Sequence, residues 1–222
     1  MEKILQEDSL TVYRTVLGLV KTNTYFLVDQ DTGQTVVVDP ADKGDWIVDQ
    51  AKTKNWKISA IWLTHAHFDH IAGAAGVVDG TEYPVPIAMH PADLPLYRNH
   101  GGASFFGLPI FKLPGDPDVL LEDGAVLELG KNHFTARFTP GHSPGHVVFI
   151  QKNERFVLCG DLIFQGGVGR TDISGGDWDQ LVESIRSRIY TLPSDTILLP
   201  GHGESTTVAA ERTENPFVQG VI

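Results

Sequence analysis

The chain has 222 residues, of which 41% are hydrophobic and 20% charged, and its formal net charge at pH 7 is −11. This composition excludes a disordered chain, because the apolar fraction is high enough to build a core. The acidic excess repels phosphate backbones, so we expect no nucleic-acid partner. No apolar run approaches the roughly 18 residues of a membrane-spanning helix, so we expect no membrane partner either.

The start of the chain and its cysteine content predict a cytoplasmic protein. The first ten residues, MEKILQEDSL, lack the apolar core of a signal peptide. The single cysteine, Cys159, excludes an intrachain disulfide and fits a reducing compartment. Neither a repeat nor a linker-like run divides the sequence. We therefore expect residues 1–222 to form one domain, as a monomer or a small homo-oligomer.

In chain order, the first half of the sequence predicts short strands and one helix. Runs of β-branched, aromatic and other apolar residues predict strands at 10–17, 24–28, 35–38, 58–63 and 85–89. Turn residues over 29–33 predict a hairpin between the second and third of these strands. The segment 44–54 is predicted to be a helix.

The second half of the sequence predicts further strands and the clearest helix. The strands are expected at 127–129, 135–139, 147–150, 156–158 and 196–199. Apolar residues at helical spacing predict a helix over 177–190, and Asp177 with Gln180 can form a capping box at its start. A short terminal helix is expected over 208–214. These elements fit either two packed sheets with helices outside or a single mixed sheet covered by helices.

The segment Thr64-His65-Ala66-His67-Phe68-Asp69-His70 holds four potential metal ligands immediately after a buried strand. His65 and His67 are two residues apart in an extended stretch, so their rings point the same way and can converge on one ion. Asp69 and His70 begin the next element and can face a second ion nearby. This spacing predicts a metal site at the end of the strand.

Further ligand candidates follow other predicted strands, each beside a glycine. They are His142, Asp161 and His202. Loops at strand ends are where a rigid scaffold presents functional groups, so we expect these side chains to join the first four. Each of the remaining histidines is expected to be solvated, capping or hydrogen-bonded within the fold: His90, His100, His133 and His146.

The ligand motif, followed by these three residues in this order, resembles the metallo-β-lactamase superfamily. The resemblance extends from about Val16 to Phe217. It implies an α/β protein with an αββα sandwich of two mixed sheets flanked by helices, and two divalent metal ions at one edge. It assigns His65, His67 and His142 to one ion, Asp69, His70 and His202 to the other, and Asp161 to a bridge between them. Asp39 matches a position that braces the ligand loop.

Within that superfamily, the chain is similar to the short bacterial glyoxalase II-like thioester hydrolases. The segments that carry this similarity are 160–164, 169–172, 175–177, 201–204, 211–212 and 215–217. Only 20 residues follow His202, so we expect no helical C-terminal glutathione-binding domain. Arg170 stands where the full-length enzymes have a lysine that contacts glutathione, and Asp172 and Glu204 replace two tyrosines. Arg170, with its neighbour Thr171, is therefore a candidate substrate contact, but an ion pair between Arg170 and Asp172 is an equal alternative.

The resemblance implies a metal-dependent hydrolase of a small-molecule thioester or glutathione-type substrate, such as S-lactoylglutathione. A hydroxide shared by the metals would be the nucleophile, and Asp69 would be both a ligand and the group that orients it. Zinc is expected first, with iron or manganese as alternatives, since the same ligands accept all three. The rival functions are a persulfide dioxygenase with a single iron, and a lactonase or other ester hydrolase.

For one residue, Cys159, and one segment, 99–117, the sequence allows two interpretations each. Cys159 ends a buried strand pattern and is interpreted as a packed, inert thiol rather than a ligand or redox group. The segment 99–117 is rich in glycine and phenylalanine. It is either a flap that covers substrate or an apolar cluster packed on the surface of the sandwich, and we favour the cluster.

Overall fold

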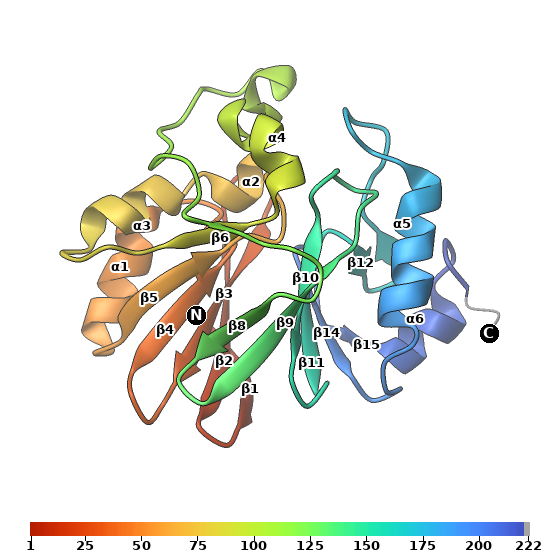
Figure 1. Cartoon of the computed structure of the whole chain (residues 1–222), viewed down its shortest axis with the longest axis horizontal. Helices are drawn as coiled ribbons and strands as arrows, with labels where there is room; N and C mark the ends of the chain where they lie inside the picture. Colours follow the sequence, from red (N-terminus) through yellow and green to blue (C-terminus); the bar gives the residue numbers. More distant parts are fainter. Residues whose placement is uncertain (220–222) are drawn as a thin grey trace.

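The computed structural model describes residues 1–219, so residues 220–222 of the predicted domain lie outside the described residues. Two β-sheets pack face to face, and helices cover their outer faces (Figure 1). This arrangement confirms the predicted αββα sandwich and excludes a single mixed sheet. Within residues 1–219, every helix is too short or too polar to cross a bilayer.

The first sheet has seven strands in sequence order and is mixed. Its strands are β1 (Glu2–Glu7), β2 (Leu10–Leu17), β3 (Thr22–Asp29), β4 (Gln34–Val38), β5 (Lys57–Trp62), β6 (Ile87–Met89) and β7 (Val119–Leu120). The strands from β1 to β4 pair antiparallel, whereas those from β4 to β7 pair parallel. All eight residues of β3 are buried, because this interior strand is covered on both faces.

The second sheet has six strands in the order β15-β14-β11-β10-β9-β8. Their bounds are β8 (Val126–Leu129), β9 (Asn132–Phe138), β10 (Val147–Gln151), β11 (Phe156–Gly160), β14 (Ile197–Pro200) and β15 (Thr206–Thr207). Only the β11–β14 pair is parallel among these strands. A separate small hairpin consists of β12 (Ile163–Phe164) and β13 (Gly167–Val168).

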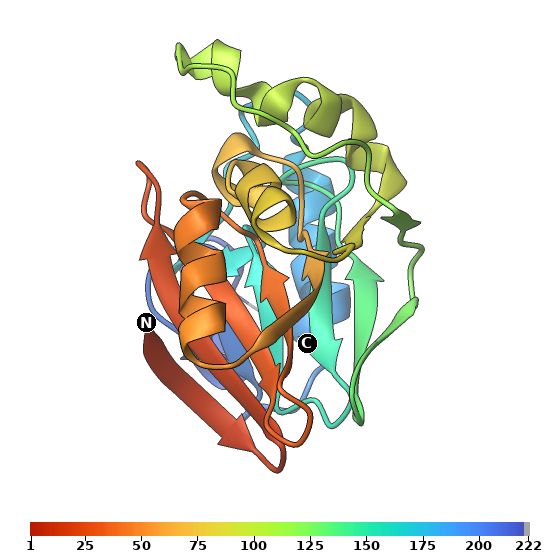
Figure 2. The same cartoon turned by 90° about the vertical axis from the view of Figure 1, so that its left-hand side faces the viewer.

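Helices cover both outer faces of the sandwich (Figure 1). Those on the side of the first sheet are α1 (Gly44–Thr53), α2 (Phe68–Ile71), α3 (Ala74–Gly80) and α4 (Leu94–Arg98), with the 3₁₀ turns η1 (Pro91–Asp93) and η2 (His100–Phe106). Those on the second sheet are α5 (Trp178–Ser184), its π-helical continuation η3 (Ile185–Ile189) and α6 (Val208–Glu214). Figure 2 looks onto the first sheet and shows α1 and α3 lying side by side on it. A Cβ at Gly76 would lie only 2.9 Å from Cα of Gly44, so these helices can cross this closely only without side chains there.

Three apolar clusters hold these layers together. Between the sheets, Trp62 packs its ring against Phe134 and Phe149 with centroids 5.2 and 5.4 Å apart. A second cluster lies beneath α1 and α3 and a third beneath α5, where Leu181 and other apolar residues of the predicted helix face β10 and β11. Burial of apolar surface on both sides of each sheet is the main stabilising term of such a sandwich.

Several elements differ from the prediction. Strand β1 pairs with the edge of the first sheet, although its sequence EKILQE has no clear alternation of apolar residues. The short strands β7, β12, β13 and β15 were also not predicted. The predicted helix over 177–190 is α-helical only to Ser184 and continues as a π-helical turn. At its start, Asp177 accepts a hydrogen bond from the Gln180 amide N–H at 3.0 Å, but the Gln180 side chain donates to the Asp177 carboxylate at 2.9 Å, so the capping box forms only in part.

The segment 99–117 lies above the first sheet, on the side of α4 (Figures 1 and 2). Phe111 and Leu113 pack against the cluster beneath α1, as the packed-cluster interpretation predicts. Phe105 and Ile110 are instead 79% and 68% exposed. The segment is therefore anchored at Phe111 and Leu113 and presents apolar side chains to solvent at Phe105 and Ile110.

Candidate metal centre

The structure brings all seven predicted ligands together at one edge of the sandwich. They come from segments that follow strands: His65 and His67 after β5, Asp69 and His70 on α2, His142 between β9 and β10, Asp161 after β11, and His202 after β14. Their ligand atoms form three overlapping groups in which all atoms lie within 4.8 Å of one another. The two sheets thus contribute to one site.

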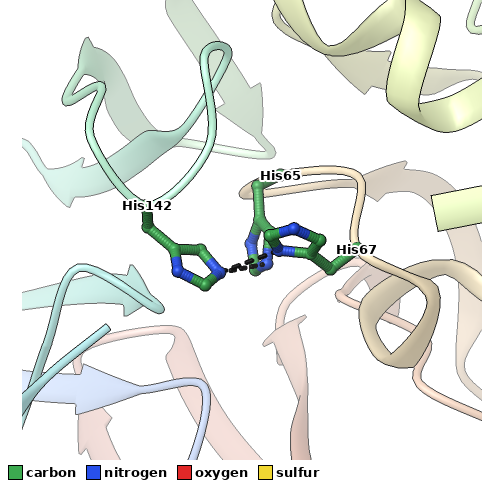
Figure 3. Close-up of side chains that lie close together, drawn as sticks. All are labelled: His65, His67 and His142. Atoms are coloured by element: carbon green, nitrogen blue, oxygen red, sulfur yellow. Dashed lines mark hydrogen bonds between the residues drawn. The ribbon is translucent and has the colours of Figure 1, made fainter. Parts of the chain in front are cut away.

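The rings of His65, His67 and His142 converge on one point (Figure 3). His142 Nε2 lies 2.8 Å from His67 Nδ1 and 3.2 Å from His65 Nε2. On its other side, His142 Nδ1–H donates to the Arg170 carbonyl at 2.8 Å. That contact fixes the tautomer, so Nε2 presents a lone pair to the site. Three ring nitrogens that face one another in this way form a site for a cation.

A second group lies beside the first and shares a carboxylate with it. His202 Nε2 lies 3.2 Å from Asp69 Oδ2 and 3.5 Å from Asp161 Oδ2. Asp161 Oδ1 lies 3.3 Å from His70 Nε2, while Asp161 Oδ2 lies 3.6 Å from His142 Nε2. Asp161 therefore contacts members of both groups. This is the place that the family resemblance assigns to a bridging ligand.

Two buried atoms of the cluster show that the residues present fit metal ions. His70 Nε2 and Asp161 Oδ1 are both buried and lie 3.3 Å apart, yet neither makes a hydrogen bond with any of the described residues. Leaving such atoms unsatisfied costs about 1–3 kcal/mol each. A divalent cation between them would satisfy both atoms, and a set of imidazole nitrogens and carboxylate oxygens suits zinc, iron or manganese.

The protonation states of the first group also suit a metal. Burial lowers the pKa of His65, and burial with the neighbouring His142 ring lowers the pKa of His67 to about 3. Burial lowers the pKa of His142 as well. These imidazoles are therefore neutral at pH 7, which is the form that coordinates a metal ion.

The pKa values of the second group favour a positive charge between its two carboxylates. Burial alone would raise the pKa of Asp69, but His70 and His202 lower it to about 2. Burial likewise opposes the charged form of His202, yet its hydrogen bonds to Asp161 and Asp69 raise its pKa to about 9. The paired carboxylates therefore stabilise a cation at this point, whether a proton or a metal ion.

Asp39 braces the ligand loop at the position that the resemblance implies. It follows β4 and has a left-handed backbone conformation with φ of 49°. Its Oδ2 accepts a hydrogen bond from His70 Nδ1–H at 2.9 Å and from the Thr64 hydroxyl at 2.7 Å, and its Oδ1 accepts from the Thr64 N–H at 2.8 Å. The contact to His70 turns the other ring nitrogen, Nε2, toward the cluster.

Asp93 is a supporting residue that the sequence reasoning missed. It is fully buried, and its carboxylate accepts hydrogen bonds from the Ala66 N–H at 2.9 Å, the Ser143 hydroxyl at 2.8 Å and the Gly145 N–H at 2.6 Å. Burial raises the pKa of Asp93, and these three donors oppose that rise. The residue joins the loop of His65 and His67 to the loop of His142. It belongs to no ligand-like motif, so only its place in the fold reveals this role.

Thr22 and His146 are two further supports. The Thr22 hydroxyl donates to Asp69 Oδ2 at 2.8 Å and so orients that carboxylate. The Asp161 N–H donates to His146 Nε2 at 3.1 Å, and the other ring nitrogen of His146 lies 2.9 Å from the Thr139 hydroxyl. His146 is thus hydrogen-bonded within the fold, as expected, and it positions the backbone of Asp161.

Gly201 allows the His202 loop to approach the cluster closely. A Cβ at this position would overlap Asp161 Oδ1 and lie 2.8 Å from Cε1 of His70. The Gly201 N–H donates to the Gly160 carbonyl at 2.7 Å, and its own carbonyl accepts from the Asn23 N–H at 2.7 Å. The backbone here is fixed from both sheets, so a side chain at residue 201 has no room to shift away.

Arg170 was predicted either to contact the substrate or to form an ion pair with Asp172. The Arg170 guanidinium donates to both oxygens of Asp172 at 2.7 and 2.9 Å, which is the predicted ion pair. Arg170 also lines the cavity over the cluster, and its contact with substrate stays a prediction. Thr171 makes no side-chain hydrogen bond with the described residues, and Glu204 pairs with Arg14 at 2.9 Å.

Cys159 lies away from this chemistry. It is fully buried in the cluster beneath α5, and burial raises the pKa of its thiol. A protonated, inaccessible thiol is neither a metal ligand nor a nucleophile. This agrees with the predicted inert role.

A comparison with protein families and curated proteins supports this interpretation of the site. A family model described as the metallo-β-lactamase superfamily matches residues 17–202, which include all seven candidate ligands. The probable metallo-hydrolase YqgX of Bacillus subtilis (strain 168) is 38% identical over 213 residues, which are 93% of this chain and 97% of YqgX. The hydroxyacylglutathione hydrolase GloC of Haemophilus influenzae is 31% identical over 194 residues, which are 86% of this chain and 91% of GloC.

Solved structures extend the likeness to three dimensions. BLEG-1, described as a B3 metallo-β-lactamase, superposes with a TM-score of 0.85 at 34% identity, covering 94% of this chain and all of BLEG-1 (100%). TTHA1623 in a di-iron-bound form superposes with a TM-score of 0.80 at 38% identity, covering 92% of this chain and 99% of TTHA1623. The chain therefore belongs to the metallo-β-lactamase superfamily, as its histidine motif indicated, and is one of its metallo-hydrolases.

Proposed function

We propose that this protein is a metal-dependent hydrolase of thioesters, with S-lactoylglutathione as the reference substrate. One observation carries the proposal: the Asp161 carboxylate lies between two groups of potential ligands, 3.6 Å from His142 on one side and 3.3 and 3.5 Å from His70 and His202 on the other. Two buried atoms of this cluster, His70 Nε2 and Asp161 Oδ1, make no hydrogen bond within the described residues. The similarity to a protein named hydroxyacylglutathione hydrolase supports the choice of thioesters.

The proposed centre holds two divalent ions, with zinc expected first and iron or manganese as alternatives. One ion would be held by His65, His67 and His142, the other by Asp69, His70 and His202, and Asp161, which contacts His142 and His202, would face both. Bound divalent ions supply two effects, an acidic water that ionises near pH 7 and a positive charge that polarises a carbonyl. The di-iron form of TTHA1623 keeps iron open as the metal of this chain.

Asp69 has the geometry of the group that orients the attacking water. Its Oδ2 is held by the Thr22 hydroxyl and lies 3.2 Å from His202 Nε2, which leaves Oδ1 for a water hydrogen. Its low pKa, about 2, keeps it ionised at pH 7 and able to accept that hydrogen bond. No serine or cysteine nucleophile is required, and the buried Cys159 could not act as one. A thiolate suits this site as a leaving group because it is a weak base.

The test combines elemental analysis with a substrate panel. Protein purified without added metal is analysed for zinc, iron and manganese, then assayed on S-lactoylglutathione, glutathione persulfide, a lactone and a β-lactam. We expect about two ions per chain and thiol release from the thioester. One iron per chain with oxygen uptake on the persulfide would instead establish the dioxygenase rival.

Two variants make the panel specific. Asp69→Ala should lower thioester kcat/KM by about 10²–10⁴-fold, whereas Asp116→Ala, at an exposed carboxylate paired with Arg98, should leave it intact. The β-lactam is included because BLEG-1 is described as a β-lactamase. Turnover of the lactone or the β-lactam without turnover of any thioester would reject the proposed substrate class.

A further inference from the structure

Two cavities meet at the candidate metal centre, and the second is not needed for the chemistry proposed above. The larger, of about 580 Å³, lies over the cluster and is lined by Asp69, Asp161 and His202 among others. The smaller, of about 360 Å³, lies between α4, η2 and the loop that follows Arg170. His67, Phe106 and Ile173 line both cavities. Both volumes lie within the usual range of small-molecule sites, about 300–1,000 Å³.

The smaller cavity has an uncharged and largely apolar wall. Its apolar lining includes Pro95, Leu96, Phe105, Phe106, Pro144 and Ile173. Among the described residues, its lining contains no Asp, Glu, Lys or Arg, and its polar side chains are His67, Asn99 and Ser174. A carboxylate or an ammonium group placed here would lose its water without gaining a partner of opposite charge.

The wall of this cavity is fixed directly to the ligand loop. Gly101 has φ of 62°, and a Cβ there would overlap the backbone of Phe68 and lie 2.6 Å from the carbonyl carbon of His67. The ring of Phe106 packs against Phe68 with centroids 5.4 Å apart. Because η2 lies against the residues that present His67, the cavity keeps a set position relative to the cluster.

The larger cavity is also poor in free positive charge. Its outer lining is apolar and includes Leu19, Val20, Leu108, Phe164 and Val168. Arg170 is its only arginine or lysine among the described residues, and the guanidinium is paired with Asp172 through two hydrogen bonds. The carboxylates of a glutathione moiety would therefore find no unpaired guanidinium or ammonium group in the lining of either cavity.

We propose that the substrate is a thioester with an apolar arm, which lies in the smaller cavity while its carbonyl lies at the metal centre. This inference rests on the proposed thioester hydrolysis and narrows its substrate class. Exposed apolar side chains at the mouth, with Phe105 at 79% and Leu19 at 78%, fit a surface that an apolar ligand covers. A thioester of glutathione, with two carboxylates, is a poorer match to these walls than a thioester of the same acyl group with an alkyl thiol.

Chain length is the decisive variable in the test. Thioesters of one acyl group are prepared with alkyl thiols of two to eight carbons, and thioesters of one short thiol with acyl groups of two to eight carbons. We expect kcat/KM to rise roughly threefold per methylene group on the arm that enters the smaller cavity, until the cavity is full. The lactoyl ester of hexanethiol should be cleaved with a higher kcat/KM than S-lactoylglutathione.

Variants of the smaller cavity test whether the dependence on chain length arises there. Ser174→Asp adds a charge to the wall. In this variant, kcat/KM should rise by less than 1.5-fold per methylene group on the arm that enters the smaller cavity. Ala92→Trp, on another part of the lining, should reduce the cavity volume, so kcat/KM should stop rising at a shorter arm than in the wild type. Gln165→Asp, an exposed position that lines neither cavity, is the matched control and should keep the wild-type dependence.

A binding measurement provides a readout besides turnover. Ketones in which a methylene group replaces the thioester sulfur should bind more tightly as the same arm lengthens, and Ser174→Asp should remove this gain in calorimetry. Thioester turnover without any dependence on chain length, or a preference for S-lactoylglutathione, would overturn the inference alone. A wild-type, metal-loaded protein that cleaves no thioester would refute the proposed function and the inference with it.

Discussion

Replacing Asp93 by asparagine should weaken the metal centre without changing a ligand. The carboxylate accepts three hydrogen bonds, two at Oδ2 from Ala66 and Ser143 and one at Oδ1 from Gly145. Asparagine has the same shape but replaces one oxygen by an NH₂ group. In either orientation of the amide, at least one buried donor then faces another donor instead of an acceptor.

The size of the effect follows from these hydrogen bonds. A hydrogen bond to a charged group contributes about 1.5–3 kcal/mol, and a buried donor left without a partner costs about 1–3 kcal/mol. Because one hydrogen bond is removed and the other two become bonds to a neutral acceptor, the free energy of unfolding should fall by about 2–4 kcal/mol. For a chain of this size the melting temperature should fall by about 5–15 °C.

Urea unfolding of the chelated protein measures the loss of stability, and competition with a chromogenic chelator measures metal affinity. Because Asp93 joins the loops that carry His65, His67 and His142, we expect affinity to fall by about tenfold, at the low end of effects for residues that support ligands. Asp116→Asn, at an exposed position, is the control and should change neither quantity. If Asp93→Asn unfolds at the wild-type urea concentration and binds metal as tightly, the carboxylate does not connect the two loops.

Three further predictions follow from the same geometry. Asp69→Ala should lower thioester kcat/KM by about 10²–10⁴-fold. Thr22→Val removes one hydrogen bond to Asp69 and should lower kcat/KM by up to about tenfold. Equal losses in both variants would contradict a positioning role for Thr22. Gly201→Ala should lower metal affinity at least about tenfold, since its Cβ would overlap Asp161, whereas Gly167→Ala, where a Cβ meets only ordinary contacts at 3.7 Å, should not. Chelation should lower the melting temperature, and metal restored at 100 times its Kd should stabilise the fold by about 2.7 kcal/mol; an unchanged melting curve would argue against a metal held by the folded state.

The centre of the site could be predicted because its densest part is local. His65, His67, Asp69 and His70 lie within six residues after a buried strand, and alternation along an extended chain already places the first two rings on one side. The bracing role of Asp39 came only from the family resemblance. The pairing of Arg170 with Asp172 was one of two open alternatives, and the structure shows that ion pair.

The positions of most longer strands and of the main helix were also predictable, since both depend on the local pattern of apolar residues. The π-helical turn after Ser184 was not, because the residues that follow continue the same helical spacing. Strand β1 was missed because its residues have no clear alternation of their own. It is a strand because the edge of β2 offers unpaired backbone groups to it.

By itself, the sequence determined which side chains are candidates for the chemistry: a run of histidines and an aspartate after one strand, single His or Asp residues beside glycines after others, and an apolar fraction sufficient for a core. Tertiary structure alone decided how these side chains lie relative to one another. Asp93, Thr22 and His146 support the ligands through contacts between segments far apart in the chain, and such contacts leave no periodic signal in the sequence. The smaller cavity is likewise formed where η2 packs on the ligand loop, so its apolar wall exists only once both sheets have assembled.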